Sequence, residues 1–337
     1  MGKVTHACTS VIPVHFQKKC STEACFEQGQ GVFCQAIEIC TTSAVCCLPM
    51  ERQAAYTGKH GAQWKCERTM SNYIFDNAAP QASQRFSSLE TLYDPWTIRH
   101  LEATGIGPGW QCWEVGAGGG SIATWLGERC GPTGHVLVTD IDPRFLVELA
   151  PLAHPTLEIQ RHDIGSDPLP AQSFDLIHAR LVLIHVPARE QALVRMVTAL
   201  VPGGWLVIDD FDVTLLDSTY PTANVAAAAL FQKMRAAQNR LMAARSGEQA
   251  LTWGRSLYRR LRALGLVNVG MEGFLALREG RSPGAHLIRA NFEQIRQEAI
   301  TAGFITNEEV AQMLTLLDDP DFAVSAPVMF TTWGRRP

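Results

Sequence analysis

A glycine-rich turn preceded by one acid is the feature of the sequence best suited to bind a ligand. The turn follows a short apolar segment and opens an amphipathic one, and it contains Glu114, Gly116, Ala117, Gly118 and Gly120. Glycines permit a tight turn and a close approach of the backbone to a ligand. The N-terminus of a following helix would add free N–H groups and partial positive charge, which suit a carboxylate or a phosphate. We therefore predict a nucleotide-type site at this turn.

Two further acids follow apolar segments farther along the chain. Asp140 ends the segment after the turn, twenty residues past Gly120, and its carboxylate could accept hydrogen bonds from both hydroxyls of a ribose. Asp142 is better placed to cap the segment that begins at Pro143, which leaves Asp140 for the ligand. Asp163 ends the next apolar segment and either faces the ligand or only caps a loop.

The pattern E-x-G-x-G-x-G resembles the first motif of the class I S-adenosylmethionine (SAM)-dependent methyltransferases. The later segments FDLIHAR and PGGWLVIDD are similar to the fourth and fifth strand motifs of that family, in the same order, and the resemblance covers residues 85–337. It implies a Rossmann-like methyltransferase fold with SAM as the cofactor. A nicotinamide-binding turn would need a third glycine where Ser121 stands, which disfavours an NAD-dependent oxidoreductase.

The resemblance also implies roles for residues around the turn. In the family, an acid at the position of Asp163 commonly meets the adenine amino group, with an apolar neighbour, here Ile164, against the ring. Ile141 belongs to the same expected cofactor site, next to Asp140. Arg180 contacts either the cofactor carboxylate or only an acidic neighbour. Because the SAM site alone does not prove catalysis, a SAM-binding protein with a regulatory or non-methylating role is the alternative.

Methyl transfer is an in-line displacement, so the main task of the protein is to hold the acceptor close to the methyl group in a water-poor site. A base is needed only if the acceptor must lose a proton. The candidate catalytic residues are His185, Asp210 and Asp212, at the ends of the fourth and fifth expected strands. His178 alternates with apolar residues and is more typical of a structural histidine.

A small-molecule acceptor is expected, whose accepting atom could be oxygen, nitrogen or carbon. The net charge of −4 gives no general attraction to nucleic acid or to an anionic membrane. An arginine run over residues 255–262 is typical of a solvated helix face. Large apolar residues in the C-terminal half either line an acceptor pocket or form plain core: Phe231, Met234, Met242, Trp253 and Phe292.

Apolar segments that alternate with amphipathic ones predict an α/β fold with a doubly wound, mostly parallel, seven-stranded sheet. Strands are expected within 110–118, 135–142, 157–164, 173–186, 205–213, 267–277 and 326–337. Helices are expected over 82–104, 121–130, 143–153, 188–200, 222–246, 252–266 and 284–317. Two helical insertions, about 217–250 and 284–317, could form a lid or could simply cover one face of the sheet.

Residues 1–69 differ in composition from the rest of the chain. They hold eight of the ten cysteines and one leucine, without lasting periodicity, so we expect a poorly ordered extension ahead of a methyltransferase domain at 70–337. The cysteine spacings do not match paired zinc ligands, and no metal site is predicted. No run of 18 apolar residues occurs, and the two remaining cysteines suit a reducing compartment, so no membrane span and a cytoplasmic location are expected. The sequence makes no prediction of the oligomeric state.

Overall fold

The computed structural model describes residues 25–27, 32–34, 73–146, 156–170, 173–215 and 224–337. The chain divides into two units, Met1–Arg68 and Thr69–Pro337. In the first unit, β1 (Cys25–Glu27) and β2 (Val32–Cys34) pair as an antiparallel hairpin, which the sequence did not predict. Apart from this hairpin, the expectation of a poorly ordered extension concerns residues outside the described ranges.

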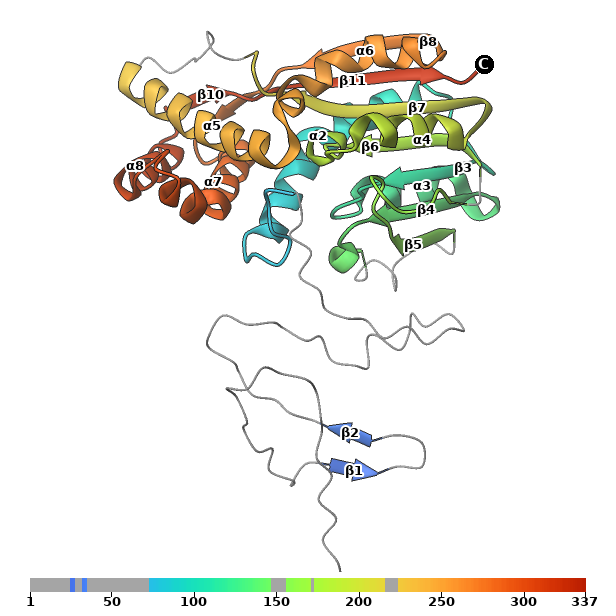
Figure 1. Cartoon of the computed structure of the whole chain (residues 1–337), viewed down its shortest axis with the longest axis horizontal. Coiled ribbons are helices and arrows are strands. Elements are labelled where there is room, and N and C mark those ends of the chain that lie inside the picture. Colours follow the sequence, from blue (N-terminus) through green and yellow to red (C-terminus); the bar gives the residue numbers. More distant parts are fainter. Residues whose placement is uncertain (1–24, 28–31, 35–72, 147–155, 171–172, 216–223) are drawn as a thin grey trace, which may run out of the picture. The chain divides into compact units, whose positions relative to one another are not determined.

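A seven-stranded sheet forms the centre of the second unit, in the order β5-β4-β3-β6-β7-β11-β8 (Figure 1). The strands are β3 (Gln111–Val115), β4 (His135–Asp140), β5 (Leu157–Arg161), β6 (Phe174–Arg180), β7 (Leu200–Asp212), β8 (Val267–Phe274) and β11 (Val328–Arg335). Neighbours from β5 to β7 are parallel, whereas β11 is antiparallel to both β7 and β8. The predicted doubly wound, mostly parallel sheet is confirmed.

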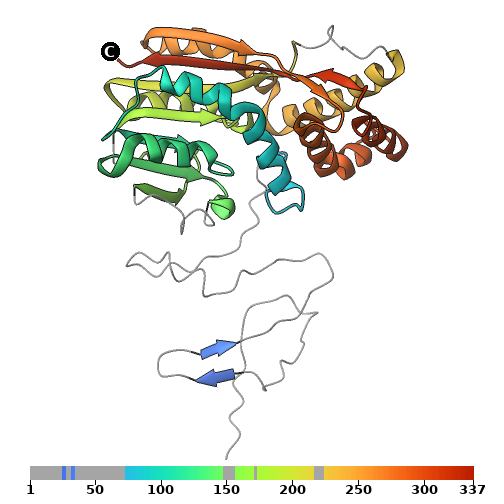
Figure 2. The same cartoon turned by 180° about the vertical axis from the view of Figure 1, so that it is seen from behind.

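Both faces of this sheet are covered by helices, as Figures 1 and 2 show from opposite sides. Side chains alternate along each strand, so Cys112 packs toward Leu126 on one face while the next residue, Trp113, packs toward Leu257 on the other. The first face carries α2 (Ala82–Glu102) and α3 (Ser121–Cys130), and the second carries α4 (Arg189–Ala199) and α6 (Trp253–Ala263). Burial on both faces explains why the central strands carry consecutive apolar residues, such as Leu176 and Ile177 of β6.

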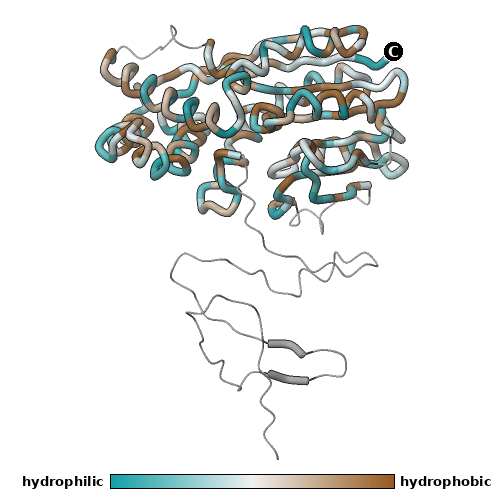
Figure 3. Tube along the Cα trace, in the orientation of Figure 1, coloured by the Kyte–Doolittle hydropathy of each residue, from teal (hydrophilic) through white to brown (hydrophobic). Residues whose placement is uncertain are grey.

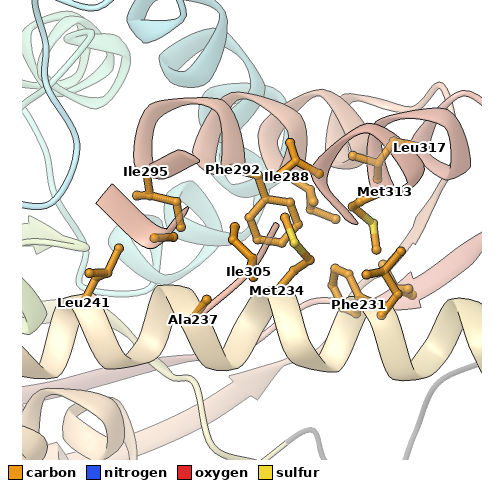
Figure 4. Close-up of a cluster of buried hydrophobic side chains, with 14 of the residues drawn as sticks. Phe231, Met234, Ala237, Leu241, Ile288, Phe292, Ile295, Ile305, Met313 and Leu317 are labelled. Atoms are coloured by element: carbon orange, nitrogen blue, oxygen red, sulfur yellow. The ribbon is translucent and has the colours of Figure 1, made fainter. Parts of the chain in front are cut away.

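Three further helices form a helical lobe with its own core: α5 (Val225–Ser246), α7 (Pro283–Thr301) and α8 (Asn307–Leu317). Figure 4 shows Phe231 and Met234 of α5 pointing toward Phe292 of α7 and Met313 of α8. Along these helices, hydrophobic and hydrophilic residues alternate (Figure 3), as expected when one side of each helix is buried. The insertions therefore pack on one another rather than simply covering the sheet.

Several predicted boundaries differ from the structure. The helical stretch 284–317 divides into α7 and α8, because Thr306 and Glu309 form a capping box that starts a new helix. A second hairpin, β9 (Leu277–Glu279) with β10 (Ala323–Ser325), was missed. Pro143–Phe145 is a 3₁₀ helix, and the predicted helix beyond residue 146 lies outside the described residues. Within the described ranges, no helix is long and apolar enough to cross a bilayer.

Candidate cofactor site and acceptor cavity

A cavity of about 340 Å³ lies at the carboxyl ends of β3, β4, β5 and β6. The strand order reverses between β3 and β6, and ligands of open α/β sheets bind at such a reversal. Nine of the ten predicted cofactor residues line this cavity: Glu114, Gly116, Ala117, Gly118, Asp140, Ile141, Asp163, Ile164 and Arg180. The tenth, Gly120, is the N-cap of α3 behind the turn.

The glycine turn requires glycine for both conformation and space. Gly116 and Gly118 have φ values of +66° and +56°, in the left-handed region that other residues rarely adopt. A Cβ atom on Gly116 would lie 2.3 Å from a methyl carbon of Val182, and one on Gly118 would lie 2.7 Å from the ring of Phe86. The turn is therefore closely packed against Val182 and Phe86, which line the cavity together with Gly116 and Gly118.

Asp140 holds the turn and faces the same cavity. Its Oδ2 accepts a hydrogen bond from the Gly118 N–H at 2.9 Å, and its Oδ1 accepts one from the Asp142 N–H at 2.8 Å. Burial raises the pKa of the Asp140 carboxyl, and the two backbone donors oppose that rise. A carboxylate has about four acceptor sites, so Asp140 retains capacity for the hydroxyl groups of a ligand.

Asp163 caps a loop, which was one of its two expected roles, and it also lines the cavity. Its Oδ1 accepts the Gly165 N–H at 2.8 Å and its Oδ2 accepts the Ser166 hydroxyl at 2.9 Å, which is a loop-capping arrangement. The residue also lines the cavity, with the buried Ile164 beside it. Ile141, by contrast, is 41% exposed and offers an apolar surface at the cavity wall.

Arg180 has an acidic neighbour, which was one of its two expected partners. Its guanidinium forms an ion pair with Asp94 of α2 at 2.7 Å and donates a hydrogen bond to the Thr97 hydroxyl at 3.2 Å. Arg180 also lines the cavity, and the nearby Glu90 has a raised pKa because of burial and the charge of Asp94. The arginine is thus fixed at the wall by α2.

One face of α2 contributes to the cavity, which the sequence analysis missed. Arg85, Phe86, Leu89 and Glu90 all line it, together with Tyr73 and Asn77 from the segment before the helix. Positions i, i+1, i+4 and i+5 share one side of a helix, so the periodicity of residues 82–104 contained this signal. The periodicity alone did not show that this face of the helix lines the cavity.

A buried charged row runs across three strands below the cavity. Nδ1 of His178 lies 2.7 Å from the Glu114 carboxylate, and Nε2 of the same ring lies 3.5 Å from the Asp209 carboxylate. Asp209 also accepts a hydrogen bond from the Thr97 hydroxyl at 2.5 Å. Burial alone would lower the pKa of His178, but the charges of Glu114 and Asp209 outweigh it and raise that pKa to about 9. His178 is therefore a buried imidazolium, in agreement with its predicted structural role.

The predicted catalytic residue His185 lies where the first cavity meets a second one. Its ring packs edge-on against Tyr73, with centroids 4.6 Å apart. Burial and the positive charges of Arg85 and Arg189 lower the pKa of His185 to about 3. The imidazole is therefore neutral at physiological pH and has a free lone pair.

The other two predicted catalytic residues are placed differently. Asp210 is fully buried and accepts the Ile184 N–H at 3.0 Å, and burial raises its pKa to about 8. Asp212 accepts hydrogen bonds from Thr214 and pairs with Arg255 at 2.9 Å. Neither residue is among those lining the two cavities in the described part of the chain. The Asp210 carboxyl group thus binds the backbone of the segment after β6, and Asp212 binds the backbone just after β7.

The second cavity, of about 60 Å³, lies between the sheet and the helical lobe. It shares four lining residues with the first: Arg85, Leu89, Leu181 and His185. Among the apolar residues predicted for either pocket or core, Met242 and Phe292 line this cavity. Phe231 and Met234 are lobe core, and Trp253 packs between the sheet and α6.

Comparison with known proteins identifies the family of this site. A family model described as "Methyltransferase domain" matches residues 113–208, which include the turn and strands β4 to β6. Residues 113–208 form a class I SAM-dependent methyltransferase domain. SAM is the cofactor of this family of enzymes, in agreement with the expectation from the glycine turn.

The similar proteins are matched over part of their length. Over 100 residues the chain is 39% identical to "Methyltransferase str2" of Strobilurus tenacellus, covering 29% of this chain and 34% of that protein. It is 27% identical over 151 residues to the ubiquinone/menaquinone biosynthesis C-methyltransferase UbiE of Laribacter hongkongensis, covering 40% of this chain and 62% of that protein. The chain thus spans between about a third and three fifths of these relatives.

Solved structures with the same fold are more distant. Phosphoethanolamine N-methyltransferase 2 of Haemonchus contortus is 13% identical, with a TM-score of 0.47 over 78% of this chain and 59% of that chain. A cyclopropane-fatty-acyl-phospholipid synthase-like protein of Lactobacillus casei is 14% identical, with a TM-score of 0.46 over 78% of this chain and 97% of that chain. Neither likeness bears on the acceptor of this protein.

Proposed function

We propose that the protein transfers the methyl group of SAM to a small-molecule acceptor, at oxygen, nitrogen or carbon. The observation that carries the proposal is the wall shared by the two cavities, made of Arg85, Leu89, Leu181 and His185. An acceptor in the second cavity would face a cofactor in the first. A pair of adjoining sites of this kind serves transfer between two ligands, whereas a regulatory SAM-binding site needs only one.

The residues of the first cavity fit SAM by their chemistry. The spare acceptor capacity of Asp140 suits ribose hydroxyls, and Asp163 with Ile164 offers an acceptor and an apolar surface for adenine. Gly116, Ala117 and Gly118 line the cavity, so the backbone of the glycine turn would contact the methionine portion. When bound, SAM supplies an electrophilic methyl carbon on a sulfonium.

The protein would contribute positioning and exclusion of water. It would hold the nucleophilic atom of the acceptor in line with the methyl carbon, so that the carbon–sulfur bond could break, with its electrons left on sulfur, as the new bond forms. Where the acceptor carries a proton, the neutral ring of His185 would accept a hydrogen bond from the acceptor and orient it. A pKa of about 3 makes the ring too weak a base to keep the proton, which would pass to solvent. Tyr73 and Phe75 pack around that ring and limit the access of water.

A small acceptor is supported by the size of the second cavity, about 60 Å³, and by its position beneath the helical lobe. The arginine run of α6 is partly paired within the domain, since Arg255 contacts Asp212 and Arg260 contacts Glu190. It offers little free charge for nucleic acid. We place the reaction in the cytoplasm, because the buried free thiols Cys112 and Cys130 are typical of a reducing compartment.

The proposal is tested by calorimetric titration with SAM and NAD, followed by methyl release onto a panel of phenols, amines and activated carbons. We expect SAM binding, no comparable NAD binding, and methyl transfer to at least one acceptor class. Replacing His185 by Leu should slow transfer to an acceptor that loses a proton by about tenfold, the effect of losing one orienting hydrogen bond. Tighter binding of NAD than of SAM would refute the proposal.

A further inference from the structure

Two buried arginines line the second cavity without a carboxylate partner. Arg85 and Arg278 are each 5% exposed, and neither forms an ion pair with any residue in the described part of the chain. Arg278 donates a hydrogen bond to the Tyr93 hydroxyl, but its buried Nε atom has no hydrogen-bond partner among the described residues. A buried charge without a counter-charge is costly, so its retention calls for an explanation.

Arg85 is held in place by neutral groups. Its Nε donates to the side-chain oxygen of Asn291 at 3.0 Å, and its guanidinium lies 4.3 Å from the ring centroid of Phe75. These contacts orient the cation without neutralising it. Both arginines are therefore fixed and still carry a full positive charge at the cavity wall.

No acid compensates this charge within the cavity. Its described lining residues include a third arginine, Arg235, and the amides Gln238 and Asn291, but no Asp or Glu. The positive field reaches the cavity junction, where Arg85 and Arg189 contribute to the low pKa of His185. The remaining walls are mainly apolar, with Leu89, Leu181, Phe211, Leu287, Ile288 and Phe292.

We propose that the second cavity binds an anionic group, a carboxylate or a phosphate, through Arg278 and Arg85, and that the methyl acceptor is an apolar small molecule carrying that anion. This identification of the substrate class rests on the proposed function. A guanidinium presents paired donors that match a carboxylate or a phosphate. The cavity of about 60 Å³ holds roughly four to six water-sized units, so it accommodates the anionic group while the apolar remainder extends toward His185.

The test compares ligands that differ in charge but hardly in shape. The full chain, with and without saturating S-adenosylhomocysteine, is titrated with benzoate, with benzamide and with phenyl phosphate. We expect benzoate or phenyl phosphate to bind at least tenfold more tightly than benzamide. The ligand with the higher affinity shows whether the site prefers a carboxylate or a phosphate. Equal affinity for benzoate, phenyl phosphate and benzamide would overturn the proposal.

Variants then locate the anion. Arg278→Gln should weaken binding of the preferred anion at least tenfold and leave the affinity for S-adenosylhomocysteine unchanged, because Arg278 does not line the first cavity. Arg296→Gln is the matched control, since this half-buried arginine of α7 lines neither cavity and forms hydrogen bonds only with Asn307 among the described residues. If Arg278→Gln does not fold, the partly buried Arg235→Gln replaces it and should weaken the anion at least threefold.

The outcomes separate this inference from the proposed function. If the folded variant, Arg278→Gln or Arg235→Gln, bound the anion as tightly as the wild type, the proposed anion site would be overturned. Failure of S-adenosylhomocysteine to bind would overturn the methyltransferase proposal. The anion site would still be supported if benzoate or phenyl phosphate bound more tightly than benzamide and lost this advantage in Arg278→Gln.

Discussion

At the scale of single residues, Asp140 links the glycine turn to the expected ribose position. We predict that Asp140→Ala weakens SAM binding by about 1.5–3 kcal/mol, the loss expected for charge-assisted hydrogen bonds. Calorimetric titration measures the change. Asp142→Ala is the control, because the Asp142 side chain pairs with Arg144 and does not line the cavity. Equal affinities of the Asp140 variant and the wild type would remove Asp140 from the site.

His185 predicts an acid-dependent loss of stability. Its pKa is about 3 in the folded protein and about 6.5 in an unfolded chain, so the unfolded state binds more protons between these values. The contribution of the neutral His185 ring to the free energy of unfolding is fully present above pH 6.5 and decreases as the pH falls toward 3. At pH 5 the loss is roughly 2 kcal/mol. Denaturant unfolding at pH 7 and pH 5 should show a smaller difference for His185→Gln than for the wild type. The same difference in both proteins would contradict the low pKa.

Residues of the first cavity were predictable from sequence to the extent that local chemistry marks them. Gly116, Gly118, Asp140 and Asp163 carry the signal of a turn or a strand end, and all line the first cavity. Asp210 and Asp212 carried a similar signal, but the direction of a side chain at a strand end depends on neighbours such as Ile184 and Arg255, which are distant in sequence.

At the scale of secondary-structure elements, the Glu114–His178–Asp209 row ties β3, β6 and β7 together. Because the pKa of His178 is raised to about 9, its contribution to stability is complete below pH 6.5 and is lost as the pH rises through 9. We expect a loss on the order of 2–3 kcal/mol across this window. The His178→Gln variant should be less stable at pH 6.5 and should lack this part of the pH dependence in denaturant titrations. A wild-type slope retained in the variant would rule out the buried imidazolium.

The glycine turn predicts a second effect at this scale. Gly116→Ala places a Cβ 2.3 Å from Val182 in a backbone conformation with φ of +66°, so β3 and the loop after β6 must separate. Strain of this kind costs about 1–3 kcal/mol. Thermal unfolding should show the loss and titration should show weaker SAM binding. Gly131→Ala is the control for conformation alone, because it has a similar φ of +63° but open space around it. Equal losses in the two variants would show that the contact with Val182 is unimportant.

Elements with clear periodicity were predictable, and short ones were not. The seven strands of the sheet follow from apolar runs separated by glycine and proline. The β9–β10 hairpin joins residues 277–279 to 323–325, and three-residue strands have no periodicity to detect. The division of α7 from α8 was present in the sequence as the capping residues Thr306 and Glu309.

At the scale of the whole molecule, the second cavity arises from segments that are far apart in the chain. Arg85 comes from α2, Phe211 from β7, Arg278 from β9 and Asn291 from α7. Each of these residues is ordinary in its local sequence. Their convergence depends on the lobe packing beside the carboxyl ends of the sheet, and this is why composition and periodicity could not reveal two unpaired guanidinium groups in one cavity.

The division at residues 68–69 predicts that the second unit folds without the first. A chain starting at Met70 should retain S-adenosylhomocysteine binding and a melting temperature within about 2 °C of the full chain, because Thr69–Pro337 forms a compact unit by itself. A chain starting at Ala79 is the matched control. It lacks Ile74 and Phe75, each 5% exposed in the lobe core, whose burial contributes roughly 1.5–3 kcal/mol apiece.

Calorimetry should therefore show a melting temperature lower by roughly 6 °C or more for the Ala79 start than for the Met70 start. Loss of Tyr73 also removes the ring that packs against His185, so the shorter chain should have slower methyl transfer as well as lower stability. If the Met70 start were as unstable as the Ala79 start, the cysteine-rich segment would be part of the folded enzyme. Equal stability of the Met70 start and the full chain would instead assign the stability of the catalytic unit to residues 70–337 alone, whatever the eight N-terminal cysteines do.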